Sequence, residues 1–71
     1  MPNEFWNRPC ASKGWISYRY PSAHSWIMIG AKDHDEALRE AQRSMWIGTA
    51  TMDRLEIWSE PEQAYVPVTG L

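Results

Sequence analysis

The chain has little that could cross-link or anchor a small fold. Cys10 is its only cysteine, so no disulfide can form within it. Cys10, His24 and His34 lack the spacing of metal ligands, so no metal site is expected. A chain of 71 residues buries only a small core, and such domains often gain stability from a disulfide, a metal or oligomerisation. Only oligomerisation is left, so we expect a homo-oligomer, with a dimer as its simplest form.

Charge and hydropathy exclude further classes of protein. Seven basic and nine acidic residues give a net charge of −2, which argues against direct nucleic-acid binding through a basic stripe. No apolar run approaches the roughly 18 residues that a membrane span needs. The polar N-terminal segment, with Pro2 and Pro9, lacks the positive start and apolar stretch of a signal peptide. We therefore expect a cytoplasmic protein that makes no membrane contact.

Aromatic residues are abundant. Five tryptophans and three tyrosines are a high proportion of a chain of 71 residues. Such side chains let a small core bury more area per residue. They are also, together with arginine, the usual anchors of protein interfaces. The composition leaves both interpretations open.

Four short runs have the composition of β-strands. Residues 15–20 and 25–31 are rich in aromatic and β-branched side chains, and the segment between them has hairpin length. Residues 54–59 alternate polar and apolar side chains. Residues 64–68 form a fourth run, and Pro67, which has no N–H to donate, favours an edge position for it.

One segment between the second and third runs has helical character. Asp33 suits the N-cap of a helix that continues to Met45, and Glu36 stands three residues later, as in a capping box. The order β-β-α-β-β predicts an α+β fold, a four-stranded antiparallel sheet with one helix packed on one face. We expect a single domain over residues 14–71 and an irregular N-terminal arm over residues 1–13.

Side chains alternate across a strand, so each strand divides into two sets. The mainly aliphatic set is expected to face the helix: Ile16, Tyr18, Tyr20, Ile27, Ile29, Ala31, Leu55, Ile57, Ala64, Val66 and Val68. The opposite set is expected to form the contact or assembly surface, with two arginines adding polar specificity: Trp15, Trp26, Met28, Trp58, Tyr65, Arg19 and Arg54.

One helix can cover only one face of this sheet. An exposed patch of several large aromatic residues exceeds what monomeric proteins usually show. The second face is therefore expected to meet a partner protein or a second copy of the chain. The alternative is partial cover by the N-terminal arm through Phe5 and Trp6.

The sequence carries no catalytic signature. It has no familiar Ser/His/Asp spacing, no glycine-rich phosphate loop, and no HExxH or CxxC motif. His24 fits a hairpin loop, His34 fits a helix surface, and Cys10 fits a bystander in the arm. The acidic cluster of Asp33, Asp35 and Glu36 is explained by helix capping. We therefore expect a non-enzymatic protein without a cofactor.

An alternative function is the sequestration of a small nucleotide signalling molecule. Arginine, serine and tyrosine donors can bind phosphate, and aromatic rings can stack on a base. The helix N-terminus, where phosphate binds most readily, is instead occupied by carboxylates. The candidate donors are Ser17, Arg19, Tyr20, Arg39 and Arg43.

The strand and helix segments resemble those of small hypothetical proteins encoded by bacteriophages and prophages of Gram-negative bacteria. The resemblance is carried by Gly14–Tyr20, Trp26–Ala31, Asp35–Ser44, Arg54–Trp58 and Tyr65–Val68. It implies a non-structural phage product, a class that often binds and blocks a host component, including CRISPR effectors and other immune machinery. It carries over no functional residue. With the aromatic face, it leads us to expect stoichiometric binding of a host protein in the host cytoplasm.

Overall fold

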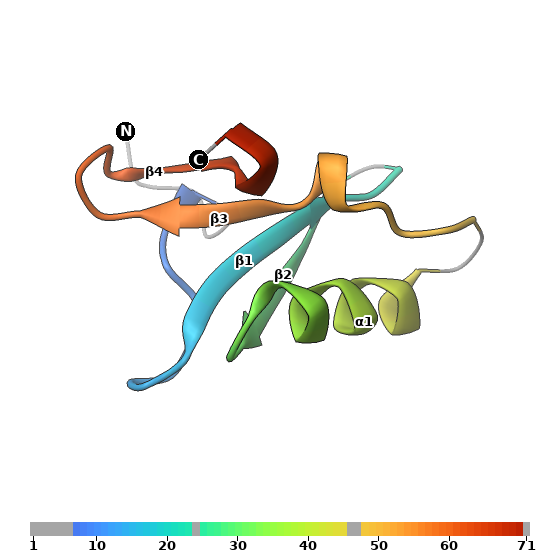
Figure 1. The fold of residues 1–71 in the computed structure, drawn as a ribbon, viewed down its shortest axis with the longest axis horizontal. Helices are drawn as coiled ribbons and strands as arrows, with labels where there is room; N and C mark the ends of the chain where they lie inside the picture. The colour runs from blue at the N-terminus through green and yellow to red at the C-terminus, as the bar shows by residue number, and fades with distance from the viewer. Residues whose placement is uncertain (1–6, 24, 46–47, 71) are drawn as a thin grey trace.

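The computed structural model describes residues 7–23, 25–45 and 48–70. It shows an α+β fold with one antiparallel sheet and one helix, as the sequence predicts (Figure 1). The strands lie in the order β2-β1-β3-β4, and every neighbouring pair is antiparallel. The elements are β1 (Ile16–Pro21), β2 (Trp26–Ala31), α1 (His34–Ser44), β3 (Glu56–Ser59) and β4 (Ala64–Pro67).

The central strand β1 holds the two halves of the sheet together. It pairs with β2 on one side, where Tyr18 lies opposite Ile29, and with β3 on the other, where Tyr18 lies opposite Ile57. The β3–β4 hairpin then places β4 at the far edge. Pro67 lies in this edge strand, as expected from its missing N–H.

The third and fourth strands are shorter than predicted. Met52–Arg54 forms a 3-10 turn, and the N–H of Leu55 donates to the Met52 carbonyl oxygen at 3.2 Å. This local bond takes a donor that a strand ladder would use, so β3 begins at Glu56. After β4, Val68 enters a second short turn and its N–H donates to the Leu55 carbonyl oxygen at 3.0 Å.

Helix α1 begins as predicted at the N-cap Asp33. The Asp33 carboxylate accepts the N–H of Glu36 at 2.8 Å. The Glu36 carboxylate accepts the N–H of Lys32 at 2.7 Å, one residue before the position that a capping box would use. The helix ends at Ser44, and Met45, predicted as its last residue, is the C-cap.

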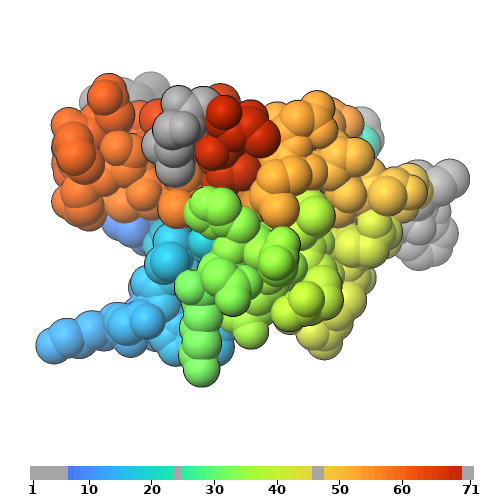
Figure 2. All heavy atoms as spheres, viewed as in Figure 1, coloured from blue at the N-terminus to red at the C-terminus, as the bar shows by residue number. Residues whose placement is uncertain are grey.

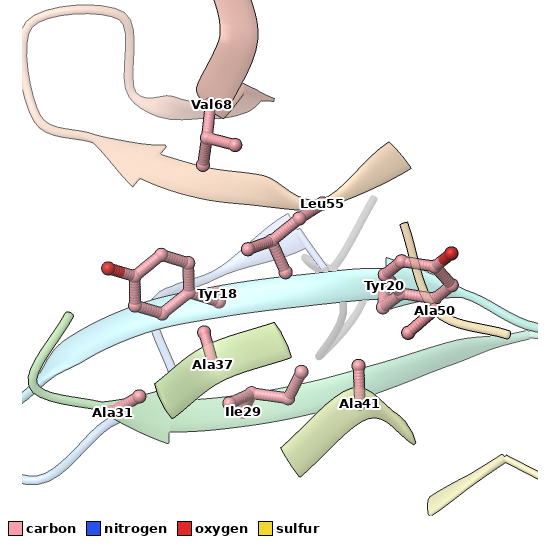
Figure 3. Packing of buried hydrophobic residues seen from close by; sticks show 9 residues of the cluster. All are labelled: Tyr18, Tyr20, Ile29, Ala31, Ala37, Ala41, Ala50, Leu55 and Val68. Carbon is pink, nitrogen blue, oxygen red and sulfur yellow. The ribbon is translucent and has the colours of Figure 1, made fainter. Parts of the chain in front are cut away.

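The core lies between α1 and the helix-facing side of the sheet (Figure 3). Tyr18, Tyr20 and Leu55 are fully buried there. Ala37 and Ala41 are also fully buried, and their small side chains let the helix approach β1 and β2 closely (Figure 1). The predicted division of the strands into two faces is therefore confirmed for these buried residues.

Two members of the predicted inward set are corrected. Ile16 and Ala64 are exposed, because each stands at the first position of its strand, outside the area that α1 covers.

The turn that leads into β1 projects from the molecule, seen in blue in Figure 2. The helix and the C-terminal segments lie against each other on the face in that view.

Candidate functional site

The second face of the sheet is covered in part by the N-terminal arm. The Tyr65 hydroxyl on β4 donates to the carbonyl oxygen of Arg8 at 2.7 Å. The Ser17 hydroxyl on β1 accepts the N–H groups of Cys10 at 3.0 Å and Ala11 at 2.9 Å. Residues 8–11 therefore lie across the sheet, which corrects the expectation that one helix leaves this face bare.

Ala11 reaches as far as the edge strand β2. A Cβ added at Gly30 would lie 3.3 Å from the Cβ of Ala11, which is tighter than an ordinary contact. Ser17 and Gly30 are direct cross-strand partners, so two small residues form the part of the sheet surface on which the arm lies. Phe5 and Trp6, the arm residues expected to give cover, lie outside the described residues.

Beside the arm, an arginine is held between two aromatic rings. The guanidinium carbon of Arg19 lies 3.8 Å from the ring centroid of Trp26 and 4.7 Å from that of Tyr65. The Trp58 ring meets Tyr65 edge-on, with centroids 5.3 Å apart and an interplanar angle of 74°. We call these four residues, Arg19, Trp26, Trp58 and Tyr65, the aromatic–arginine cluster.

Further contacts fix the guanidinium of Arg19. Its Nε donates to the Glu56 carboxylate at 2.7 Å, and its Nη1 donates to the side-chain oxygen of Asn7 at 3.0 Å. Arg19 and Glu56 are cross-strand partners on β1 and β3, so the sheet register brings them together. Only 13% of the Arg19 side chain is exposed. The cluster is thus ordered before any partner binds.

Tyr65 is the buried member of the cluster. Its burial, and then its hydrogen bond with Cys10, raise the pKa of the phenol well above its ordinary value, while Arg19 opposes the shift. The phenol therefore keeps its proton and donates to the Arg8 carbonyl oxygen. The Cys10 thiol lies beside it and donates to the Ile29 carbonyl oxygen at 3.4 Å.

The other members of the predicted contact surface are spread around this cluster. Met28 is half-buried and lines a hollow of about 540 Å³ with Arg8, Pro9 and Cys10. Trp15 lies just before β1 and is 45% exposed, and the Lys32 ammonium is 5.1 Å from the centroid of one of its rings. These residues extend the aromatic surface toward the β2 side of the sheet.

Arg54 does not belong to this surface. It lies in the Met52–Arg54 turn, and its guanidinium carbon is 6.0 Å from the ring centroid of Tyr20, a core residue on the helix side. The prediction placed Arg54 in a strand, where alternation would have turned it to the opposite face. Because the strand begins at Glu56, that assignment is wrong.

The residues proposed for nucleotide binding do not form one pocket. Ser17 and Arg19 lie on the arm face, and both are engaged there. Tyr20 is fully buried on the helix side, where its hydroxyl accepts the N–H of Thr51 at 2.9 Å. Arg39 and Arg43 are exposed on α1, and Arg43 pairs with Glu40 at 2.7 Å. The sheet separates the two groups.

Neither a cluster of metal ligands nor a membrane-spanning helix is found among the described residues. No group of three or more His, Cys, Asp or Glu residues in this part of the chain could hold a metal ion. Nor is any helix within the described ranges long and apolar enough to cross a bilayer. His34 is exposed at the start of α1, with its Nδ1 2.8 Å from the Tyr18 hydroxyl, while His24 lies outside the described residues.

No protein-family model, curated protein or solved structure matches the chain. The candidate site therefore rests on the geometry of the chain itself. Arm residues Arg8, Pro9, Cys10 and Ala11 are the part of the site that the sequence interpretation missed. The signal for them was the small pair Ser17 and Gly30 in otherwise bulky strands.

Proposed function

We propose that this protein acts without catalysis, by stoichiometric binding of another protein through the face that carries the aromatic–arginine cluster. The observation that carries the proposal is the arginine held between Trp26 and Tyr65, with Trp58 against Tyr65 and both tryptophans half-exposed. Tryptophan, tyrosine and arginine dominate the energetics of protein interfaces. Here three such residue types stand together on one face.

The order of the cluster also favours binding. Arg19 already has a stacked ring on each side and a carboxylate partner in Glu56. Association normally costs about 0.5–1.5 kcal/mol for each flexible side chain that it immobilises. A cluster fixed in the free protein avoids much of that cost, so its half-exposed rings can act as rigid anchors.

The proposed partner is a protein of the host cell. The resemblance to phage-encoded proteins supports this choice, and it extends the proposal to inhibition or modulation of host antiviral machinery, such as a CRISPR effector, in the host cytoplasm. The alternative of a nucleotide sponge has no support in the geometry, because its five candidate residues lie on opposite sides of the sheet.

Site-specific photocrosslinking in host cells tests this proposal. A photoreactive phenylalanine analogue at position 58 places the label in the cluster, and the same analogue at position 39 places it on the exposed side of α1. We expect a single heterologous adduct from position 58 and none from position 39. Equal adducts from both positions, or none from position 58, would refute the proposed face.

A further inference from the structure

The two edges of the sheet are protected to different degrees. The edge strand β4 has four residues, and one of them is Pro67, which cannot donate to a ladder. The other edge strand, β2, has six residues and contains no proline and no charge. Natural proteins usually block exposed edges with charges, prolines or bulges. Strand β2 is therefore the open edge within the described part of the sheet.

We propose that β2 pairs with β2 of a second copy of this chain, antiparallel about a two-fold axis at Met28. Residues directly opposite in an antiparallel pair point to the same face of the sheet. Placing Met28 on the axis satisfies this condition, because Trp26 then lies opposite Gly30 of the partner and Ile27 lies opposite its Ile29. A one-residue slip would put side chains from opposite faces against each other.

Exposure favours this register over a two-residue shift that puts Ile29 on the axis. Trp26 and Met28 are half-exposed and Gly30 is exposed, with Ala11 of the arm lying where a Cβ of Gly30 would stand. The proposed register brings these three residues together on one face. Ile29 is already 4% exposed beneath α1, so placing it on the axis would bury little additional surface.

The charges around the edge suit pairing of two identical copies. Strand β2 contains no charged residue, so pairing two copies of it brings no like charges together. On the helix side, Gln42 bonds to Gly48 and Ala50, whereas Glu36 and Arg43 stand on another flank of α1, where Arg43 also pairs with Glu40. The two-fold axis makes the two helices antiparallel. The end of each helix α1 that carries Arg43 then points toward the end of the partner's helix α1 that carries Glu36.

The dimer also supplies the stabilisation by oligomerisation that a chain of this size is expected to need. The paired edge is about 20 Å long at ~3.3 Å per residue, and a stable interface needs roughly 1,200–2,000 Å² in total. The exposed surfaces of Trp26 and Met28 and the helix flanks add to the strand contact. The inference does not rest on the proposed function: Trp26 belongs to both surfaces, but Trp58 on β3 and Tyr65 on β4, the other aromatic members of the cluster, lie away from the β2 edge.

Disulfide trapping tests the register directly. In a Cys10→Ser background, Met28→Cys places one thiol per chain on the proposed axis, and Ala64→Cys places an exposed thiol on the other edge as a matched control. We expect a covalent dimer under mild oxidation for the position 28 variant and little for the position 64 variant. Equal yields at the two positions would overturn the register.

Light scattering on the unmodified chain provides the second readout. We expect twice the chain mass of 8.3 kDa, and a shift to the single-chain mass for Met28→Arg with an unchanged far-ultraviolet circular dichroism spectrum. A single-chain mass for the unmodified protein at the highest concentration measured would overturn self-pairing. That result would leave the proposed function intact, since the photocrosslinking at position 58 is read independently.

Discussion

The guanidinium carbon of Arg19 lies 3.8 Å from the ring centroid of Trp26, so a cation on the central strand stacks on an indole of the neighbouring edge strand. This contact joins β1 to β2 on the face opposite the helix. Tyr65 continues the stack from β4, and Glu56 neutralises the charge from β3. One side chain thus links all four strands of the sheet.

Replacing Arg19 by lysine tests the value of the planar stack. Arg19→Lys keeps the positive charge but removes the flat group that fits between Trp26 and Tyr65. We expect a loss of about 1 kcal/mol in the free energy of unfolding, because cation–π contacts of partly buried groups have this magnitude. Urea denaturation measures it, and Arg39→Lys on the exposed helix surface is the control. Equal stability of the two variants would contradict the stacking account.

Removal of the Ser17 hydroxyl tests how the arm is held. Ser17→Ala leaves the N–H groups of Cys10 and Ala11 without their acceptor. We expect a loss of about 1 kcal/mol in the free energy of unfolding, the net contribution of a typical hydrogen bond, because Cys10 is exposed and Ala11 is only half-buried. Hydrogen exchange at these two amides should accelerate relative to amides in α1. Unchanged exchange at both amides would show that the arm does not depend on Ser17.

The two buried tyrosines predict a loss of stability at alkaline pH. Burial raises the pKa of Tyr18 and of Tyr65, with Asp33 and Glu36 adding to the effect at Tyr18 and Cys10 at Tyr65. In the unfolded chain a phenol loses its proton near pH ~10. Above that pH the folded state binds more protons than the unfolded state, so the free energy of unfolding falls as the pH rises.

Urea denaturation at a series of pH values from neutral to alkaline measures this slope. The variant Tyr65→Phe has no phenol to titrate at that site, so its stability should fall less steeply above pH ~10 than that of the unmodified chain. The Tyr65 contribution is fully present below this pH and is lost as the pH rises through the folded pKa. Identical slopes in the two proteins would contradict the assigned burial of the phenol.

Much of the fold could be predicted because local patterns and tertiary packing agree. Alternation in β1 and β2 turned Tyr18, Tyr20 and Ile29 to the helix side, where they are buried. Asp33 and Glu36 marked the start of α1 because capping is a local interaction. The edge position of Pro67 followed from its missing N–H.

The candidate site was harder to predict because its contacts are long-range and follow no period. The arm has no repeating pattern, and Ser17 binds it through its backbone N–H groups, which every residue type carries except proline. The strand position assigned to Arg54 failed because the Met52–Arg54 turn delays β3. The nucleotide-binding set failed because it combined Ser17 with Tyr20, which alternation sends to opposite faces.

The binding face is tested most directly by measuring the affinity for the partner captured at position 58. Isothermal titration would compare the unmodified chain with Trp58→Ala, in the cluster and away from the β2 edge, and with Arg39→Ala on the helix as the matched control. We predict binding at least tenfold weaker for Trp58→Ala, a change of about 1.4 kcal/mol, and unchanged binding for Arg39→Ala. Equal affinity of Trp58→Ala and the unmodified chain would contradict the proposal that this face binds the partner.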